Sequence, residues 1–292
     1  MPTKQPEVVT TVDALRQAVR AERCQGRRIG FVPTMGALHE GHLSLVRVSK
    51  RECDSTIVSI YVNPSQFGPN EDLAKYPRTL QADLDRLAAC GVDRVFAPAD
   101  HQVYRPNHAT WVDVGGVAEP LEGGIRPGHF RGVATIVLKL FNLVQPDAAY
   151  FGQKDFQQVL VVRQMTRDLD VPVEVRVCPT VREADGLAMS SRNAYLTPEA
   201  RRRACVLSRG LRRAEQMVAA GACDAEQIAR QIGEILQTAA PVDVDYIALV
   251  HPETLVPVTE VREPTAVLLA VRIDGTRLID NTVLIPPDRV DS

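Results

Sequence analysis

Short apolar runs alternate with amphipathic segments along the first 180 residues of the chain. The run STIVSIYV at 55–62 is almost continuously apolar, as in a parallel strand that is covered on both faces. Residues 130–145 carry apolar side chains at helical spacing along one face. Such alternation predicts an α/β fold with a doubly wound parallel sheet. Further strands are expected at 29–33, 92–98, 147–152 and 173–180, and further helices at 41–53, 79–90 and 155–169. Thr10 and Asp13 resemble a capping pair, which predicts a first helix that ends at about Cys24.

The second part of the chain has a different pattern. Two amphipathic segments at 197–220 and 224–239 predict helices. We expect a domain boundary at about 182–186, with a Rossmann-like domain at 1–182 and a smaller C-terminal α+β domain at 183–292. Ligands of open α/β sheets bind at the carboxyl ends of the strands, so a cleft between this edge and the second domain is the expected site. A small mixed or antiparallel sheet is expected from the apolar runs at 244–250, 266–273 and 276–285.

Composition narrows the classes of function. Of the 292 residues, 45% are hydrophobic and 24% are charged, and the formal net charge is −2. This balance gives no electrostatic reason to expect nucleic acid or an anionic membrane as a partner. The arginine-rich stretch at 201–213 is better explained as the solvated face of an amphipathic helix. No apolar run could span a membrane, residues 1–20 lack the core of a secretory signal, and the six scattered cysteines are expected to be reduced thiols. These features predict a cytoplasmic protein.

The stretch PTMGALHEGH at 33–42 joins an expected strand to an expected helix. At such a junction, free backbone N–H groups and the helix dipole both favour an anion. Gly36 and Gly41 let the backbone approach a ligand closely, while His39 and His42 place two N–H donors on one helical face. This is the His-x-Gly-His pattern of nucleotidyl-transfer enzymes, so we expect phosphate handling. Zinc binding is the alternative, but the metalloprotease motif spaces its histidines four apart, and no third ligand is evident.

Two further segments suggest contacts with anions. In FGQKDFQQ at 151–158, Lys154 opens an expected helix, where its charge opposes the helix dipole. That placement indicates an anionic partner, although a solvent-exposed lysine is the simpler explanation. Gln158 lies one turn later and would face the same ligand. The segment MSSR at 189–192 offers two hydroxyls and a guanidinium for terminal phosphates, yet Ser-Ser-Arg is also common in loops.

Neutral amides follow the second strongly apolar run. Asn63 and Gln66 would hydrogen-bond substrate hydroxyls without adding charge, with ordinary turn and capping roles as the alternative. The polar segment 64–78 is either a mobile lid or an inert surface loop. The sequence has no Walker-type phosphate loop, no Gly-x-Gly-x-x-Gly after a strand and no Gly-x-Ser-x-Gly elbow. It therefore supplies donors for phosphate without an evident covalent nucleophile.

Six motifs, taken in order, closely resemble the pantothenate synthetase (pantoate–β-alanine ligase) family. They are PTMGALHEGH (33–42), VNPSQF (62–67), PNEDLAKYPR (69–78), RPGHFRGV (126–133), FGQKDFQQ (151–158) and MSSRNAYL (189–196). The resemblance implies two steps in one cleft. Pantoate attacks the α-phosphorus of Mg-ATP, which gives pantoyl adenylate and pyrophosphate, and the amine of β-alanine then displaces AMP to give pantothenate. It also implies a C-terminal domain that closes over the active site, and a homodimer formed through the first domain.

The resemblance also implies roles for individual residues. Catalytic roles fall to His42 as proton donor, to Lys154 at the α-phosphate, and to His39, Ser190 and Arg192 as further phosphate contacts. Pantoate and β-alanine would be bound by Gln66, Gln158 and Asn63. The implied ATP-binding residues are Met35, Gly36, Ala37, Leu38, His39, Glu40, Gly41, His42, Gly152, Gln153, Lys154, Asp155, Val181, Met189, Ser190, Ser191 and Arg192.

Magnesium is expected to arrive with ATP, and no side chain is assigned as its ligand. Asp83 is a candidate for holding a water molecule of the magnesium ion, but it is not included among the predicted site residues, because the spacing of the acidic residues around it is not distinctive. Gln153 stands where the family commonly has Glu, but the chemistry does not require a charge there. Two rival functions stay open. One is an adenylyltransferase that leaves AMP on a phosphorylated product, and the other is a non-catalytic module that binds nucleotide or nucleic acid.

Overall fold

The computed structural model describes residues 5–69 and 71–287; residues 1–4, 70 and 288–292 lie outside the description. The excluded residue Asn70 belongs to the segment for which a lid is one expectation. The chain divides into two units. The first runs to Gln153 and resumes at Gln157–Pro179, while the second contains Lys154–Phe156 and the chain from Thr180 onward.

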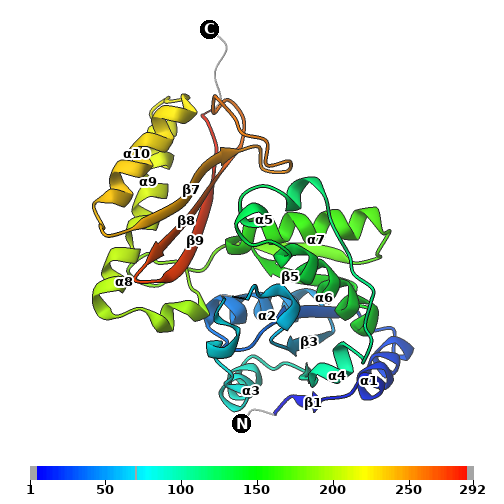
Figure 1. Ribbon diagram of the computed structural model, residues 1–292. Helices are drawn as coiled ribbons and strands as arrows, with labels where there is room; N and C mark the ends of the chain where they lie inside the picture. The colour runs from blue at the N-terminus through cyan, green and yellow to red at the C-terminus, as the bar shows by residue number, and fades with distance from the viewer. Residues whose placement is uncertain (1–4, 70, 288–292) are drawn as a thin grey trace. The chain divides into compact units, whose positions relative to one another are not determined.

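Six parallel strands form the sheet of the first unit, in the order β1-β4-β3-β2-β5-β6. Figure 1 labels β1, β3 and β5 of this sheet. From the central strand β2, the chain builds β3 and β4 on one side and later adds β5 and β6 on the other. The point between β2 and β5 is therefore a topological switch point, where open α/β sheets bind their ligands. The predicted doubly wound parallel sheet is confirmed. Its strands are β1 (Glu7–Val9), β2 (Ile29–Thr34), β3 (Ser55–Ile60), β4 (Arg94–Phe96), β5 (Ala148–Gly152) and β6 (Glu174–Cys178).

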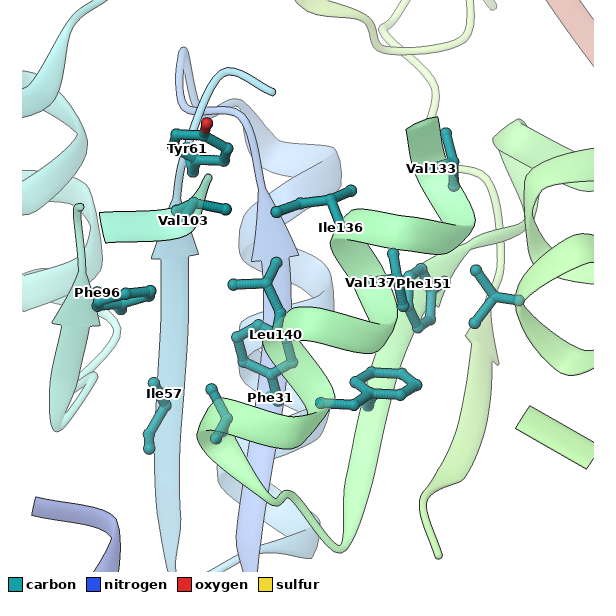
Figure 2. Close-up of a cluster of buried hydrophobic side chains, with 14 of the residues drawn as sticks. Phe31, Ile57, Tyr61, Phe96, Val103, Val133, Ile136, Val137, Leu140 and Phe151 are labelled. Atoms are coloured by element: carbon teal, nitrogen blue, oxygen red, sulfur yellow. The ribbon is translucent and has the colours of Figure 1, made fainter. Parts of the chain in front are cut away.

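Helices cover both faces of this sheet because side chains alternate along each strand. On β2, Phe31 belongs to the hydrophobic cluster under α1 (Val12–Cys24), α6 (His129–Val144) and α7 (Phe156–Asp168). Its neighbour Val32 belongs to the opposite cluster, under α2 (Glu40–Glu52) and α3 (Leu80–Ala89). Figure 2 shows the first cluster, in which Val137 and Leu140 of α6 lie beside Phe31 and Phe151 of the sheet. The shorter helices are α4 (Asp100–Val103) and α5 (Glu122–Ile125).

The second unit packs three helices on an antiparallel sheet of three strands (Figure 1). Along α9, the predicted apolar face of Leu207, Leu211, Ala214 and Val218 is buried. Arg209, Arg212 and Arg213 are exposed, as expected for a solvated helix face. In the described part of the chain, no helix has both the length and the apolar character needed to cross a membrane. The elements are α8 (Pro198–Ala204), α9 (Val206–Ala219), α10 (Ala225–Gln237), β7 (Asp243–Val250), β8 (Thr265–Ile273) and β9 (Thr276–Leu284).

Two local expectations need correction, and one strand was not predicted. The first helix is capped by Thr11 and not by Thr10, since the Thr11 side chain accepts from the backbone N–H of Ala14. The single helix expected at 197–220 is two helices, because the chain turns at Cys205 between α8 and α9. Strand β1 was not expected at all. It has only three residues, too few for a periodic pattern, and pairing with β4 makes it a strand.

Candidate active site

The predicted phosphate-binding turn connects β2 to α2 at the carboxyl edge of the sheet. Gly36 has a φ of 82° and Ala37 a φ of 49°, so the turn uses left-handed backbone at a residue that has a Cβ. His39 is the N-cap of α2 in an extended conformation, and Glu40, Gly41 and His42 form the first helical turn. The structure therefore gives this segment the strand–turn–helix form that the sequence predicts.

The two histidines of the turn interact directly. The backbone N–H of His39 donates to Nδ1 of His42 over 3.3 Å, and the two rings lie 4.1 Å apart between centroids. An Nδ1 atom that accepts a hydrogen bond carries no proton, so the neutral His42 ring holds its proton on Nε2. In this tautomer the hydrogen-bond donor of the His42 ring is Nε2–H.

Helix α3 fixes the shape of the turn through a buried carboxylate. Asp83 is fully buried and accepts from the backbone N–H groups of Ala37 (2.9 Å) and Leu38 (2.8 Å). The Thr79 hydroxyl donates to the same carboxylate over 3.2 Å, and the Arg86 guanidinium donates to the Leu38 carbonyl. These bonds hold Ala37 in its unusual conformation.

The sequence did contain a signal for this role of Asp83. The carboxylate shares the buried face of α3 with Leu87 and Ala88, where an acidic side chain needs partners. The signal could not name those partners, because the two backbone N–H groups lie 45 and 46 residues away in the chain.

Gln66 ends a short 3-10 helix, Pro64–Gln66, that follows β3, and Asn63 is the residue just before this helix. The Asn63 side chain caps this helix by accepting from the Ser65 N–H, and it also accepts from the Tyr104 hydroxyl. Its Nδ2 donates to Oε1 of Gln66 (3.0 Å) and to the carbonyl of Gly132 (3.2 Å). Asn63 is 1% exposed and bonded within the protein at both ends of its amide. It supports Gln66, and a direct contact between Asn63 and substrate stays a prediction.

Gln66 is directed towards the β2–α2 turn. Its Nε2 lies 3.2 Å from Sδ of Met35, the residue that precedes Gly36. The structure thus brings together a residue predicted to bind the acid substrate and one predicted to bind ATP.

The adjacent glutamines Gln157 and Gln158 have different surroundings. Gln157 is buried, accepts from the N–H of Glu122 and donates to the carbonyls of Val117 and Pro120. Gln158 is half-buried. The amide of Gln157 is hydrogen-bonded within the protein, whereas Gln158 has accessible surface. Substrate binding by Gln158 stays a prediction.

The remaining predicted residues follow β5 or belong to the second unit. Gly152 ends β5, and Gln153, Lys154 and Asp155 form a 3-10 turn before α7, which differs from the expected helix start at 155. The Nζ of Lys154 lies 3.7 Å from Oδ1 of Asp155, and the Lys154 carbonyl accepts from Asn281.

The segment MSSR is held beside Val181. The Met189 N–H donates to the Val181 carbonyl over 3.0 Å, and a bridge joins Arg182 to Ala188. Ser190 caps the following 3-10 helix (Ser191–Tyr195), because its hydroxyl accepts from the N–H of Arg192. The Val181 and Met189 members of the predicted ATP contacts are therefore neighbours in space, although they are eight positions apart in the sequence.

Across residues 5–69 and 71–287, no three His, Cys, Asp or Glu side chains gather in a way that could hold a metal ion.

Comparison with known proteins identifies the family. Residues 7–283 match the model of the pantoate-beta-alanine ligase family. A pantothenate synthetase from Herpetosiphon aurantiacus is 54% identical over 95% of this chain and 100% of its own length. The crystal structure of pantothenate synthetase from Thermus thermophilus superposes with a TM-score of 0.92 at 48% identity, covering 96% of this chain and 100% of that one.

A third relative was solved with ligands. Pantoate-beta-alanine ligase from Francisella tularensis, in complex with beta-gamma ATP and β-alanine, has a TM-score of 0.79 at 34% identity and covers 95% of this chain and 97% of that one. The resemblance drawn from the six motifs is thus confirmed along nearly the whole sequence, and the chain belongs to the pantoate–β-alanine ligase family.

Proposed function

We propose that this protein condenses pantoate with β-alanine in an ATP-dependent reaction that passes through pantoyl adenylate and releases AMP and pyrophosphate. The observation that carries the proposal is the β2–α2 turn at the switch point of the sheet, with its His-x-Gly-His residues at a helix N-terminus. Such a turn suits the binding of phosphate and the stabilisation of charge that develops on it. Family membership supplies the identity of the substrates.

The first step is a displacement at the α-phosphorus, in which the pantoate carboxylate attacks and pyrophosphate leaves. The protein contributes position and charge neutralisation to such a step. In our proposal, Nε2–H of His42 and the side chain of His39 donate to phosphate oxygens, and Lys154 balances the charge that builds on the α-phosphate. Ser190 and Arg192 hold the terminal phosphates that become pyrophosphate.

The second step breaks the acyl–phosphate bond. The β-alanine amine attacks the activated acyl carbon of pantoyl adenylate, loses a proton, and AMP leaves with the bonding electrons. Gln66 and Gln158 would hold the pantoyl group in place by hydrogen bonds from neutral amides, which recognise hydroxyls without attracting a competing cation. Magnesium enters as part of the ATP complex and neutralises phosphate charge.

We further propose that the two predicted domains have different roles. Residues 1–182 would bind ATP and pantoate, and residues 183–292 would close over the site. A cytoplasmic homodimer is also expected, and light scattering of the purified protein would determine its oligomeric state.

The decisive experiment measures AMP release with pantoate, β-alanine and ATP, leaving out one substrate at a time. Full turnover is expected only with all three. Pantoate should drive exchange of labelled pyrophosphate into ATP even when β-alanine is left out, because adenylate formation does not need the amine. Product formation with no such exchange would refute the adenylate route. Retention of AMP on the product would favour the rival adenylyltransferase.

A further inference from the structure

The loop that carries Gln66 lies directly against helix α6. A Cβ atom on Gly132 would be 2.3 Å from the Ser65 carbonyl oxygen and 2.7 Å from Cα of Gln66, distances that real contacts do not reach. Gly132 lies inside α6, where alanine is the better helix former. The glycine is therefore explained by the close approach of this loop.

A buried histidine joins the same loop to α6. Nδ1 of His129 lies 2.8 Å from the Gln66 carbonyl oxygen, and Nε2 lies 3.0 Å from the Arg126 guanidinium. Arg126 can only donate, so Nε2 accepts and Nδ1 carries the proton that it donates to Gln66. Burial, followed by the nearby charge of Arg126, lowers the pKa of His129 to about 4, which keeps the ring neutral in this arrangement.

Two more contacts, with three hydrogen bonds in total, hold the ends of the loop. At its start, Asn63 donates to the carbonyl of Gly132. At its far end, Arg126 donates to both carboxylate oxygens of Glu71, each over 2.7 Å. Burial alone would raise the pKa of Glu71, but the hydrogen bonds and charge of Arg126 bring it below its usual value. Three residues of this part of the chain, Asn63, Gln66 and Glu71, are thus anchored to residues within 126–132.

We propose that Arg126, His129 and Gly132 are positioning residues for recognition of the hydroxy-acid substrate, acting through Gln66. The three residues of α6 and the preceding turn hold the Gln66 backbone in place, and Asn63 holds the Gln66 side-chain oxygen. Nε2 of Gln66 is then directed towards the β2–α2 turn. This proposal rests on the proposed function for the identity of the acid, pantoate. The anchoring itself is a property of the loop and is measurable without any substrate.

The kinetic test compares two glycines inside helices. Gly132→Ala should raise the KM for pantoate at least tenfold in the pyrophosphate-exchange assay and change the KM for ATP less than twofold, since a misplacement of about 1 Å can cost two orders of magnitude. Gly233→Ala in α10 is the control, because its Cβ would meet Ile247 at an ordinary 3.5 Å. Equal rises in both KM values, or no rise for pantoate, would overturn the proposal.

The role of His129 is tested by partial rescue. Asn places its amide near the position of Nδ1, so His129→Asn keeps a donor for the Gln66 carbonyl, whereas His129→Ala removes it. The pantoate KM should rise more in His129→Ala than in His129→Asn. Equal values would mean that the hydrogen bond to Gln66 does not position the loop.

Hydrogen exchange separates this inference from the proposed function. Without ligands, the backbone amides of Asn63 and of residues 65–68 should exchange at least tenfold faster in Gly132→Ala and His129→Ala than in wild type. Their exchange should be unchanged in Gly233→Ala. Unchanged exchange in the first two variants would refute the anchoring. Faster exchange in a protein that proves unable to use pantoate would refute only the proposed substrate.

Discussion

The hydrogen bond from the His39 backbone to Nδ1 of His42 decides which proton the second histidine can offer. With Nδ1 occupied as an acceptor, the proton of the neutral ring lies on Nε2. An N–H donor held in place can stabilise charge that develops on a phosphate. The same Nε2 atom could also transfer a proton, so the geometry leaves two roles for this residue.

Substitution of His42 distinguishes these two roles. His42→Ala should slow pantoate-dependent pyrophosphate exchange by about 10²–10³, the scale of losing one preorganised donor. His42→Gln places an amide N–H near the position of Nε2 and should retain at least tenfold more activity than His42→Ala. The exposed His101 provides the control substitution His101→Gln, which should leave the rate unchanged. Equal loss in the two His42 variants would show that a titrating ring is required.

At the scale of elements, α3 acts as a support for the β2–α2 turn. Asp83 receives two backbone N–H groups of that turn, and both bonds need a carboxylate or another pure acceptor. The amide of Asn presents an NH₂ group to one of them and leaves a buried donor unsatisfied, which typically costs about 1–3 kcal/mol.

We expect Asp83→Asn to disturb ATP binding while the fold is kept. The KM for ATP should rise at least tenfold, or the exchange rate should fall by about 10², because the turn that faces the phosphates is displaced. Asp85→Asn on the same helix is a matched control, since Asp85 accepts hydrogen bonds from the exposed side chains of Gln5 and Gln81. Circular dichroism and thermal unfolding would verify folding, and normal kinetics in a folded Asp83→Asn would remove the supporting role.

His129, at the start of α6, should make the free energy of unfolding depend on pH. The pKa of His129 is about 4 when folded and close to 6.5 when unfolded, so the unfolded chain binds more protons between these values. The contribution of neutral His129 to the free energy of unfolding is therefore complete above about pH 6.5 and is lost as the pH falls towards 4. The full effect is on the order of 3 kcal/mol. Arg126, Glu71 and Glu122 are the charged groups that face this ring.

Urea unfolding at several pH values measures this effect. Wild type should lose more unfolding free energy between pH 6.5 and 4 than His129→Asn, whose side chain does not titrate. Glu71 and other carboxylates also affect stability at the acid end, but they are present in both proteins. Parallel pH profiles for the two proteins would show that His129 is not kept neutral by the fold.

At the scale of the whole molecule, the predicted ATP contacts are divided between two units. His39 belongs to the first unit and Arg192 to the second. If both residues act on one bound ATP, their effects should not be independent. The double variant His39→Ala/Arg192→Ala should therefore slow pyrophosphate exchange at least tenfold less than the product of the two single effects. Simple multiplication of the two effects would argue against action on a common ligand.

The sequence by itself determined the doubly wound sheet, the strand–turn–helix at 33–42 and the family. These follow from local information, because the periodicity of a strand or helix and the residues of a motif are adjacent in the chain. The same information failed at β1, where three residues become a strand only through pairing with β4. It also misplaced the cap of the first helix by one residue, since Thr10 and Thr11 offer the same hydroxyl.

The tertiary structure decided how the site residues are held. Asp83 meets the backbone of the turn from about 45 residues away, and His129 meets Gln66 from 63 residues away. It also gave the adjacent glutamines Gln157 and Gln158 different surroundings: Gln157 is buried and hydrogen-bonded within the protein, and Gln158 is half-buried. Such contacts depend on which buried polar groups find partners once the chain is packed, and a partner that distant leaves no mark on the local sequence pattern.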